Sequence, residues 1–335
     1  MALAAFLTHA GPADGAVPQT YTNPIGGSVT MGDPFILADQ SGYFLYGTTA
    51  VGEGFKCWFS TNLVAWKERG LVFRKHVDSW GQHTFWAPEV IRYRDRYYLI
   101  YSSQPAKTES FSARICLAVG DSPEGPFQDL HAPLLDNGWA CIDGHVFIDT
   151  NGSPYLFFTK VGVTEPPPKR FLLGINYGVK LKRDLSGIDG EPVLCTKADQ
   201  PWELPPEGRS RCTEGPFVFE RGGTYYLTYS ANHYAEPFYG IGYATAPSPL
   251  GPWTKSPDNP LVRADRSRGI SGPGHNCVIP SPDGSELLMV YHSHADPERP
   301  SGRRVVNLDR LMIQNDGRLK FIGPTKSPQP LPSGL

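Results

Sequence analysis

The 335-residue chain is 40% hydrophobic and 19% charged, and its formal net charge is −2. This balance allows a sizeable core and argues against a disordered chain, and the lack of a long Lys/Arg run argues against nucleic acid as a partner. No stretch approaches the roughly 18–20 apolar residues of a membrane span, and the six cysteines form no C-x-x-C pair that would indicate zinc.

The N-terminal segment "MALAAFLTHAGPADGA" joins a short apolar run to small residues, but no positive residue precedes that run. A signal peptide normally carries such a positive start. The apolar run and the small residues favour a signal-peptide remnant and the missing positive start argues against one, so a secreted or periplasmic location is favoured only slightly over a cytoplasmic one. We predict an N-terminal extension over residues 1–28.

One sequence pattern is repeated along the chain: a leading polar residue, an apolar strand, a turn and a strand that usually carries tyrosine. The leading residue is an acid in four copies, with the acid of the second copy at Glu89, and a histidine in the fifth. The copies cover Gly32 to Thr49, Trp86 to Ser103, Ile142 to Lys160, Thr213 to Asn232, and Pro273 to Ser293.

Each copy is followed by a more variable pair of strands, which gives four short strands per unit. Repeated four-stranded units are typical of a β-propeller. We therefore predict an all-β fold, a five-bladed β-propeller with four antiparallel strands per blade, over residues 29–325, and a C-terminal tail over 326–335. Since the first strand of each blade lines the central channel, Asp33, Asp143, Glu214 and His275 should meet at one mouth of that channel.

Carboxylates gathered at one mouth repel one another, so at least one should have a raised pKa. Glycosidic bond cleavage needs such an unequal pair, one carboxyl protonated and one ionised. The alternative for Asp33 or Asp143 taken singly is a residue that caps a turn before a strand. For the whole set in phase, the catalytic interpretation is favoured.

The ordered motifs "GDP" at Asp33, "WAPE" at Trp86, "IDG" at Asp143, "TEGP" at Glu214 and "GPGHN" at His275 resemble those of glycoside hydrolase family 43. The resemblance implies a five-bladed, inverting glycosidase. It implies that Asp33 is the general base, Glu214 the general acid, and Asp143 a third carboxylate that positions the acid and keeps its pKa high. The third motif departs from the commoner Asp-Pro, but it keeps the carboxylate.

The resemblance also implies a basic substrate-binding residue in the last blade, and the five-residue step to Asp309 favours Arg304 over Arg303. Trp86 is expected at the pocket edge, with a core position as the alternative. His233, Tyr234 and Tyr239 are expected at outer subsites. The chemistry requires no cofactor, but a hydrated calcium ion or other ion near His275 is expected. Water alone beside His275 is the alternative, and an effect of EDTA on activity or melting temperature separates the two.

The expected partner is an oligo- or polysaccharide of plant cell-wall arabinan or arabinoxylan, from which the enzyme releases terminal α-L-arabinofuranose. Long loops in the third and fourth blades should close the mouth into a pocket, which favours chain ends. β-D-Xylosidase, endo-1,5-α-L-arabinanase, an invertase-type enzyme and a glycan-binding propeller without activity are the alternatives. The oligomeric state is left open.

Overall fold

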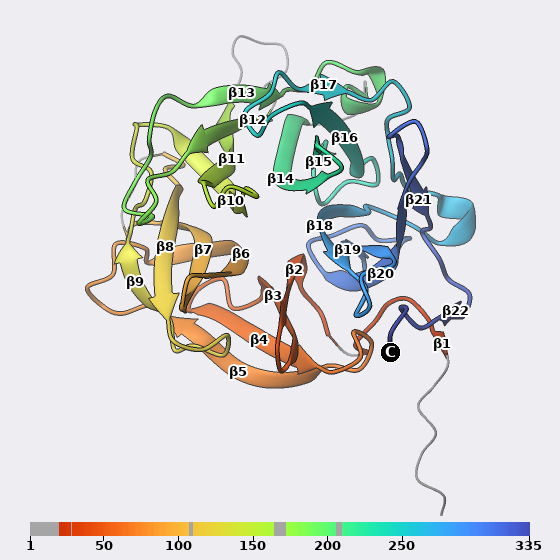
Figure 1. The fold of residues 1–335 in the computed structure, drawn as a ribbon, viewed down its shortest axis with the longest axis horizontal. Helices are drawn as coiled ribbons and strands as arrows, with labels where there is room; N and C mark the ends of the chain where they lie inside the picture. Colours follow the sequence, from red (N-terminus) through yellow and green to blue (C-terminus); the bar gives the residue numbers. More distant parts are fainter. Residues whose placement is uncertain (1–19, 28, 107–109, 164–171, 206–209) are drawn as a thin grey trace, which may run out of the picture.

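The predicted five-bladed propeller is confirmed in the computed structural model, which describes residues 20–27, 29–106, 110–163, 172–205 and 210–335. Figure 1 shows five four-stranded antiparallel units around a central axis. The first two comprise β2 (Gly32–Asp39), β3 (Gly42–Thr48), β4 (Gly54–Ser60), β5 (Lys67–Arg74), β6 (His83–Tyr93), β7 (Arg96–Gln104), β8 (Arg114–Gly120) and β9 (Gln128–His131).

The third and fourth blades are joined by a parallel pairing of β12 with β14. The last three blades comprise β10 (Ala140–Ile148), β11 (Pro154–Val163), β12 (Leu172–Lys180), β13 (Val193–Thr196), β14 (Ser210–Arg221), β15 (Thr224–Ala231), β16 (Gly240–Ala246), β17 (Thr254–Lys255), β18 (Gly274–Pro280), β19 (Leu287–His294), β20 (Arg304–Ile313) and β21 (Leu319–Ile322). Helical structure in the described residues is limited to the two 3-10 turns Pro201–Glu203 and Arg266–Arg268.

The first strand of each blade lines the axis, as expected from the repeat. The strands β2, β6, β10, β14 and β18 each contact the first strand of the next blade, and β18 contacts β2 to complete the ring. Blades pack face to face, so both faces of most strands are buried and apolar. Between blades 1 and 2, for example, the rings of Phe73 and Tyr101 lie 4.9 Å apart and those of Phe55 and Phe85 lie 5.9 Å apart.

Every inner strand carries a β-bulge near its start, where the pairing register shifts and the backbone has a positive φ. Such a bulge re-aims the side chain of the extra residue, and non-glycine residues rarely adopt this φ. At the corresponding position of each bulge, the residue with positive φ is Asp33 (55°), Ala87 (45°), Asp143 (58°), Gly215 (56°) or His275 (47°), and β6 has a further one at Thr84 (63°). One conformational device therefore presents three of the predicted site residues.

In four blades the bulge N–H donates to a side chain on the second strand of the preceding blade. These bonds are Ala87 N–Thr48 Oγ1 (2.8 Å), Asp143 N–Ser102 Oγ (2.9 Å), His275 N–Ser230 Oγ (2.7 Å) and Asp33 N–His292 Nδ1 (3.1 Å). In the remaining blade, Gly215 N instead donates to Asp143 Oδ2 at 3.1 Å. Blade 4 therefore departs from the pattern: the Asp143 carboxylate accepts from the strand that carries Glu214.

One expectation about phase was wrong. Glu214 pairs with Ser230 and precedes the bulge residue by one position, so it is not equivalent to Asp33. Glu89 lies two positions beyond its bulge residue, Ala87. Its Oε2 is 2.7 Å from His145 Nδ1, and both side chains are buried near the axis. Glu89 is therefore a partner of His145, because the bulge carries it past the mouth.

The ends of the described chain close the ring. The short strand β1 (Thr20–Tyr21) pairs with β22 (Gln329–Pro330). Asn23 donates to Leu308 O at 3.0 Å and accepts from Leu308 N at 2.9 Å. The folded unit therefore extends beyond the expected boundaries of 29–325. The expected signal remnant in residues 1–16 lies outside the described residues, and no helix of the described chain is long and apolar enough to cross a membrane.

Candidate active site

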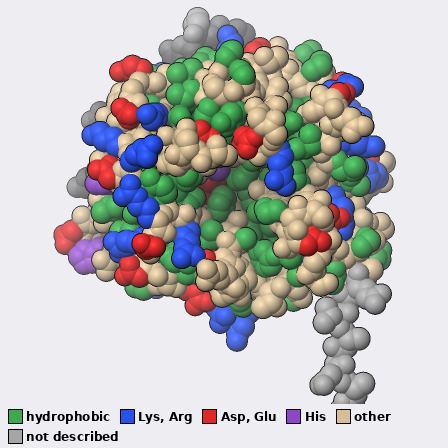
Figure 2. All heavy atoms as spheres, viewed as in Figure 1, with side chains coloured by type: hydrophobic (Ala, Val, Ile, Leu, Met, Phe, Trp, Pro, Cys, Tyr) green, Lys and Arg blue, Asp and Glu red, His purple; other side chains and the backbone are tan. Residues whose placement is uncertain are grey.

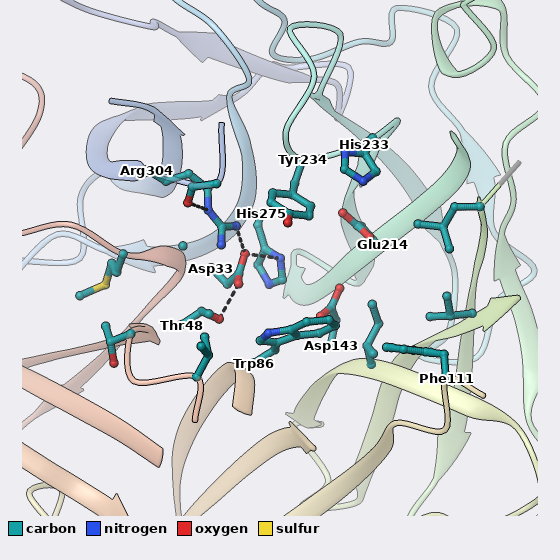
Figure 3. A pocket seen from close by; sticks show the side chains of 18 of the residues that line it. Asp33, Thr48, Trp86, Phe111, Asp143, Glu214, His233, Tyr234, His275 and Arg304 are labelled. Carbon is teal, nitrogen blue, oxygen red and sulfur yellow. Dashed lines mark hydrogen bonds and ion pairs between the residues drawn. The ribbon is translucent and has the colours of Figure 1, made fainter. Parts of the chain in front are cut away.

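A pocket of about 820 Å³ opens at one mouth of the central channel, and residues of all five blades line it. Figure 2 shows the hollow near the middle of this face. A cavity of this size lies within the range typical of small-molecule sites. Figure 3 shows Asp33, Asp143 and Glu214 around the same space, with His275 between them.

Asp33 is held as an ionised carboxylate. Its Oδ1 accepts from Arg304 Nη1 at 2.7 Å, and its Oδ2 accepts from Thr48 Oγ1 at 2.5 Å. Burial would raise the pKa of Asp33, but Arg304 and the nearby His275 and His292, together with the Thr48 hydrogen bond, outweigh it and hold this pKa well below its usual range. The site therefore offers a negatively charged acceptor at all ordinary pH values.

Asp143 has the opposite electrostatic environment. Burial is the main cause that raises its pKa to about 7, His275 opposes the rise, and Glu214 and Asp33 add to it. The sequence predicted one carboxyl with a raised pKa, and the structure assigns this property to Asp143. Its Oδ2 accepts the Gly215 N–H, so the same carboxyl is tied to the residue that follows Glu214.

This raised pKa gives a pH prediction with a definite sign. The folded chain binds the Asp143 proton more tightly than the unfolded chain, whose carboxyl titrates near its ordinary value of 3.8. The resulting stabilisation is fully present below about pH 4 and is lost as the pH rises through about 7. We expect the melting temperature of Asp143→Asn, relative to the wild type, to rise across this window. Parallel pH profiles of the two proteins would contradict the assignment.

Glu214 lies in the first strand of blade 4 and its side chain is buried. Its Oε1 accepts from Tyr239 OH at 2.8 Å, and its Oε2 accepts from Cys212 Sγ at 3.4 Å. Tyr239 was expected at an outer subsite, and this was wrong. Its ring is fully buried because it packs beneath the carboxyl instead of at the rim.

His275 lies between the carboxylates, with its Nδ1 3.3 Å from Asp33 Oδ1. Burial lowers the pKa of His275, but Asp33, Asp143 and Glu214 outweigh burial and raise it. Among the described residues, no group of three His, Cys, Asp or Glu side chains is placed to hold a metal ion. These side chains do not form a protein-ligated calcium site, which prefers six to eight oxygen ligands. The hydrated ion near His275 stays a prediction.

Arg304 faces the pocket, as predicted over Arg303, although Arg303 also reaches the lining. Its guanidinium lies directly over Gly32, where a Cβ would be 1.9 Å from Arg304 Cζ. This close approach explains the glycine of the "GDP" motif. On its other side the guanidinium lies 4.9 Å from the ring centroid of Tyr234. Arg304 thus bridges the base candidate and the predicted outer subsite.

His233 and Tyr234 line the pocket, and their rings stack with centroids 4.9 Å apart. Trp86 is half-buried at the wall, not in the core, and stacks on the exposed Phe111 at 6.0 Å with 24° between the planes. Stacked aromatic faces can pack against the apolar face of a sugar. Phe111 was missed because nothing near it in the sequence marks it. Part of the third-blade loop, residues 164–171, lies outside the described residues.

Comparison with known proteins decides the family. A family model described as glycosyl hydrolases family 43 matches residues 21–319. The chain belongs to glycoside hydrolase family 43. This confirms the resemblance seen in the motifs and removes the invertase-type alternative. As a family 43 protein it is a glycoside hydrolase, and its substrate is a glycan.

Similar family 43 proteins differ in the activities they are named for. The beta-D-galactofuranosidase xynD of Aspergillus niger is 26% identical, over 93% of this chain and 89% of that protein. The extracellular exo-alpha-(1->5)-L-arabinofuranosidase of Streptomyces avermitilis is also 26% identical, over 96% and 68%. A solved thermostable family-43 glycoside hydrolase has 44% identity and a TM-score of 0.88, and the match covers 94% of this chain and 100% of that one. A solved endo-1,4-beta-xylanase from Bacteroides thetaiotaomicron has 33% identity and a TM-score of 0.76, and the match covers 92% of this chain and 98% of that one.

Proposed function

We propose that this chain is an inverting, exo-acting α-L-arabinofuranosidase in which Asp33 is the general base and Glu214 the general acid. One observation carries the proposal: three carboxyls line the same pocket, Asp143 and Glu214 buried and Asp33 mostly buried, and Asp33 is kept ionised by Arg304. An ionised carboxylate and a second carboxyl at one site form the pair that glycosidic cleavage requires.

The proposed reaction assigns one step to each carboxyl. Asp33 takes a proton from a water molecule as the water attacks the anomeric carbon, and its four lone-pair sites leave room for this water beside Arg304 and Thr48. Glu214 gives its proton to the leaving oxygen on the other face of the sugar. Asp143 positions Glu214 through the Gly215 N–H. This geometry requires the base and acid carboxyls to be roughly 6.5–9.5 Å apart.

The shape of the pocket supports action on chain ends. All five blades contribute to its wall, including Val51 of blade 1, Phe111 of blade 2, Val161 of blade 3, Tyr234 of blade 4 and Arg303 of blade 5. A polymer cut in mid-chain needs a groove that is open on two sides. A hollow with wall residues from all five blades favours a terminal sugar instead. Release of arabinose from linear arabinan, with no early arabinotriose, is the expected product pattern.

The sugar is proposed from the relatives and is tested directly. The Streptomyces avermitilis relative is named for arabinofuranose, whereas a relative from Xylanibacter ruminicola is named a beta-xylosidase. We expect the 4-nitrophenyl α-L-arabinofuranoside to be cleaved faster than the β-D-xyloside. The 4-nitrophenyl β-D-galactofuranoside is the third substrate to test, because the Aspergillus niger relative is named for that sugar. A dominant rate on either other glycoside would replace the sugar and leave the acid and base roles standing.

Secretion is proposed as well, because two similar Streptomyces enzymes are named extracellular. Activity that stays with the cells and is absent from the medium and the periplasm would contradict it. The non-catalytic alternative, a propeller that only binds glycans, predicts no release of sugar from any of these substrates.

A further inference from the structure

The surroundings of Glu214 hold two groups for which the reaction described above has no role. We propose that Tyr239 and Cys212 are positioning residues for Glu214, and that the Tyr239 hydroxyl stabilises the Glu214 carboxylate while its proton is transferred to the leaving group. This inference rests on the proposed role of Glu214 as the acid and adds the groups that control it.

Both carboxyl oxygens of Glu214 are engaged by the protein. Tyr239, just before β16, donates its hydroxyl to Oε1 at 2.8 Å, and Cys212, two residues earlier in β14, donates its thiol to Oε2 at 3.4 Å. Tyr239 and Cys212 are fully buried. A carboxyl that is bonded at both oxygens keeps one orientation, and proton transfer depends on such orientation.

The ring of Tyr239 is itself fixed from two sides. It stacks on His292, with centroids 5.6 Å apart and planes 4° from parallel. On another side a Cβ at Gly274 would lie 1.9 Å from Tyr239 Cε1, so only glycine leaves room for the ring. His292 Nδ1 accepts the Asp33 N–H, so the Tyr239 ring lies between His292, which supports the proposed base, and the carboxyl of Glu214, the proposed acid.

The Tyr239 hydroxyl remains a hydrogen-bond donor at all ordinary pH values. Burial raises the pKa of Tyr239 well above its usual value, and the nearby carboxylates Glu214 and Asp33 raise it further. Its O–H therefore does not ionise. Thiols are much weaker donors than phenols, so Cys212 contributes orientation more than charge stabilisation.

The chemical consequence follows from the change of charge on Glu214. As the acid releases its proton, a neutral carboxyl becomes a carboxylate, and hydrogen bonds to a charged acceptor are roughly twice as strong as those to a neutral one. The Tyr239 bond is thus stronger in the transition state than in the bound substrate. Only such a differential interaction accelerates the chemical step. The gain depends on how far the proton has moved, and hence on the leaving group.

The experiment compares two glycosides of the sugar that the enzyme cleaves fastest, a methyl glycoside and a 2,4-dinitrophenyl glycoside. For Tyr239→Phe, which keeps the stacked ring, we expect kcat on the methyl glycoside to fall about 10- to 100-fold, the loss expected for one hydrogen bond to a charged group. The dinitrophenyl substrate needs little protonation, so its kcat should change much less. Cys212→Ala should lower kcat on both glycosides, as Tyr239→Phe does, but by a smaller factor.

Tyr229→Phe is the matched control, because Tyr229 lies in the same blade as Glu214 but outside the pocket lining, and its hydroxyl donates to the buried Glu203 at 2.7 Å. It should lower the melting temperature without changing the ratio of the two rates. Equal losses on both glycosides in Tyr239→Phe would reduce Tyr239 to a packing role and overturn the inference. If Glu214→Gln itself shows no dependence on the leaving group, the proposed acid is wrong. If it does and Tyr239→Phe does not, only this inference fails.

Discussion

Replacing Glu214 with glutamine is expected to lower kcat on a natural arabinofuranosyl linkage by about 10²- to 10⁴-fold, the contribution typical of general acid catalysis. The amide keeps the size of the side chain and can still accept from Tyr239 OH, which is 2.8 Å from Oε1 in the native protein. It cannot supply a proton to the leaving oxygen. On a dinitrophenyl glycoside, whose leaving group departs as an anion without help, the loss should be far smaller.

A buried glutamate in the 3-10 turn that precedes blade 4 provides the control for this substitution. Glu203 pairs with Lys255 at 2.7 Å and is not part of the pocket lining. Glu203→Gln should weaken the fold through loss of a buried ion pair, yet it should affect the two substrates equally while the protein remains folded. If Glu214→Gln also lost the same factor on both substrates, Glu214 would not be the acid.

The fold could be predicted from the sequence because the signal is repeated five times. A single apolar strand with a tyrosine-bearing neighbour indicates only a hairpin, whereas five such pairs without a helical interruption indicate a ring of blades. The strand order within each blade then follows from short connections. The β12–β14 pairing between blades could not be foreseen, since it depends on how two neighbouring blades twist together.

The site was predicted only in part, and the bulges are the reason. Asp33, Asp143 and His275 occupy equivalent bulge positions, so their convergence could be inferred from the repeat. Glu214 reaches the same pocket from the position before the bulge, and Glu89 is carried into the channel to His145. A shift of one residue in a strand reverses the direction of a side chain, and a sequence does not show where the shift occurs.

The supporting side chains were not predictable, because most of their hydrogen bonds cross from one blade to the next. Thr48 contacts both Asp33 and the backbone of Ala87, and His292 accepts the Asp33 N–H from a strand that is far away in the sequence. Each is a common residue in an ordinary strand. Their roles emerge from the packing of one blade on the next, which sets the catalytic geometry as much as the inner strands do.

Replacing Asp33 should affect every substrate alike, in contrast to Glu214. Asp33→Asn keeps a side chain that tolerates the positive φ of 55°, but a neutral amide cannot accept a proton from the attacking water. We expect kcat to fall about 10²- to 10⁴-fold on both the methyl and the dinitrophenyl glycoside, because water must be activated whatever the leaving group. Asp39→Asn, at the far end of the same strand and outside this pocket, is the control and should keep full activity.

The stereochemistry of rescue completes the test of Asp33. Asp33→Gly adopts the positive φ without strain and opens space where the carboxylate stood, so azide, an anionic nucleophile that needs no base, should restore cleavage of the dinitrophenyl glycoside. Attack from the side of Asp33, opposite Glu214, should give a glycosyl azide of inverted configuration, and the wild-type enzyme should first release the inverted sugar, both measured by NMR. A retained anomer from the wild type would mean that a carboxylate attacks carbon directly. The two carboxyls of such an enzyme lie about 5–5.5 Å apart, closer than the separation proposed here for Asp33 and Glu214. Asp33 would then no longer be the general base.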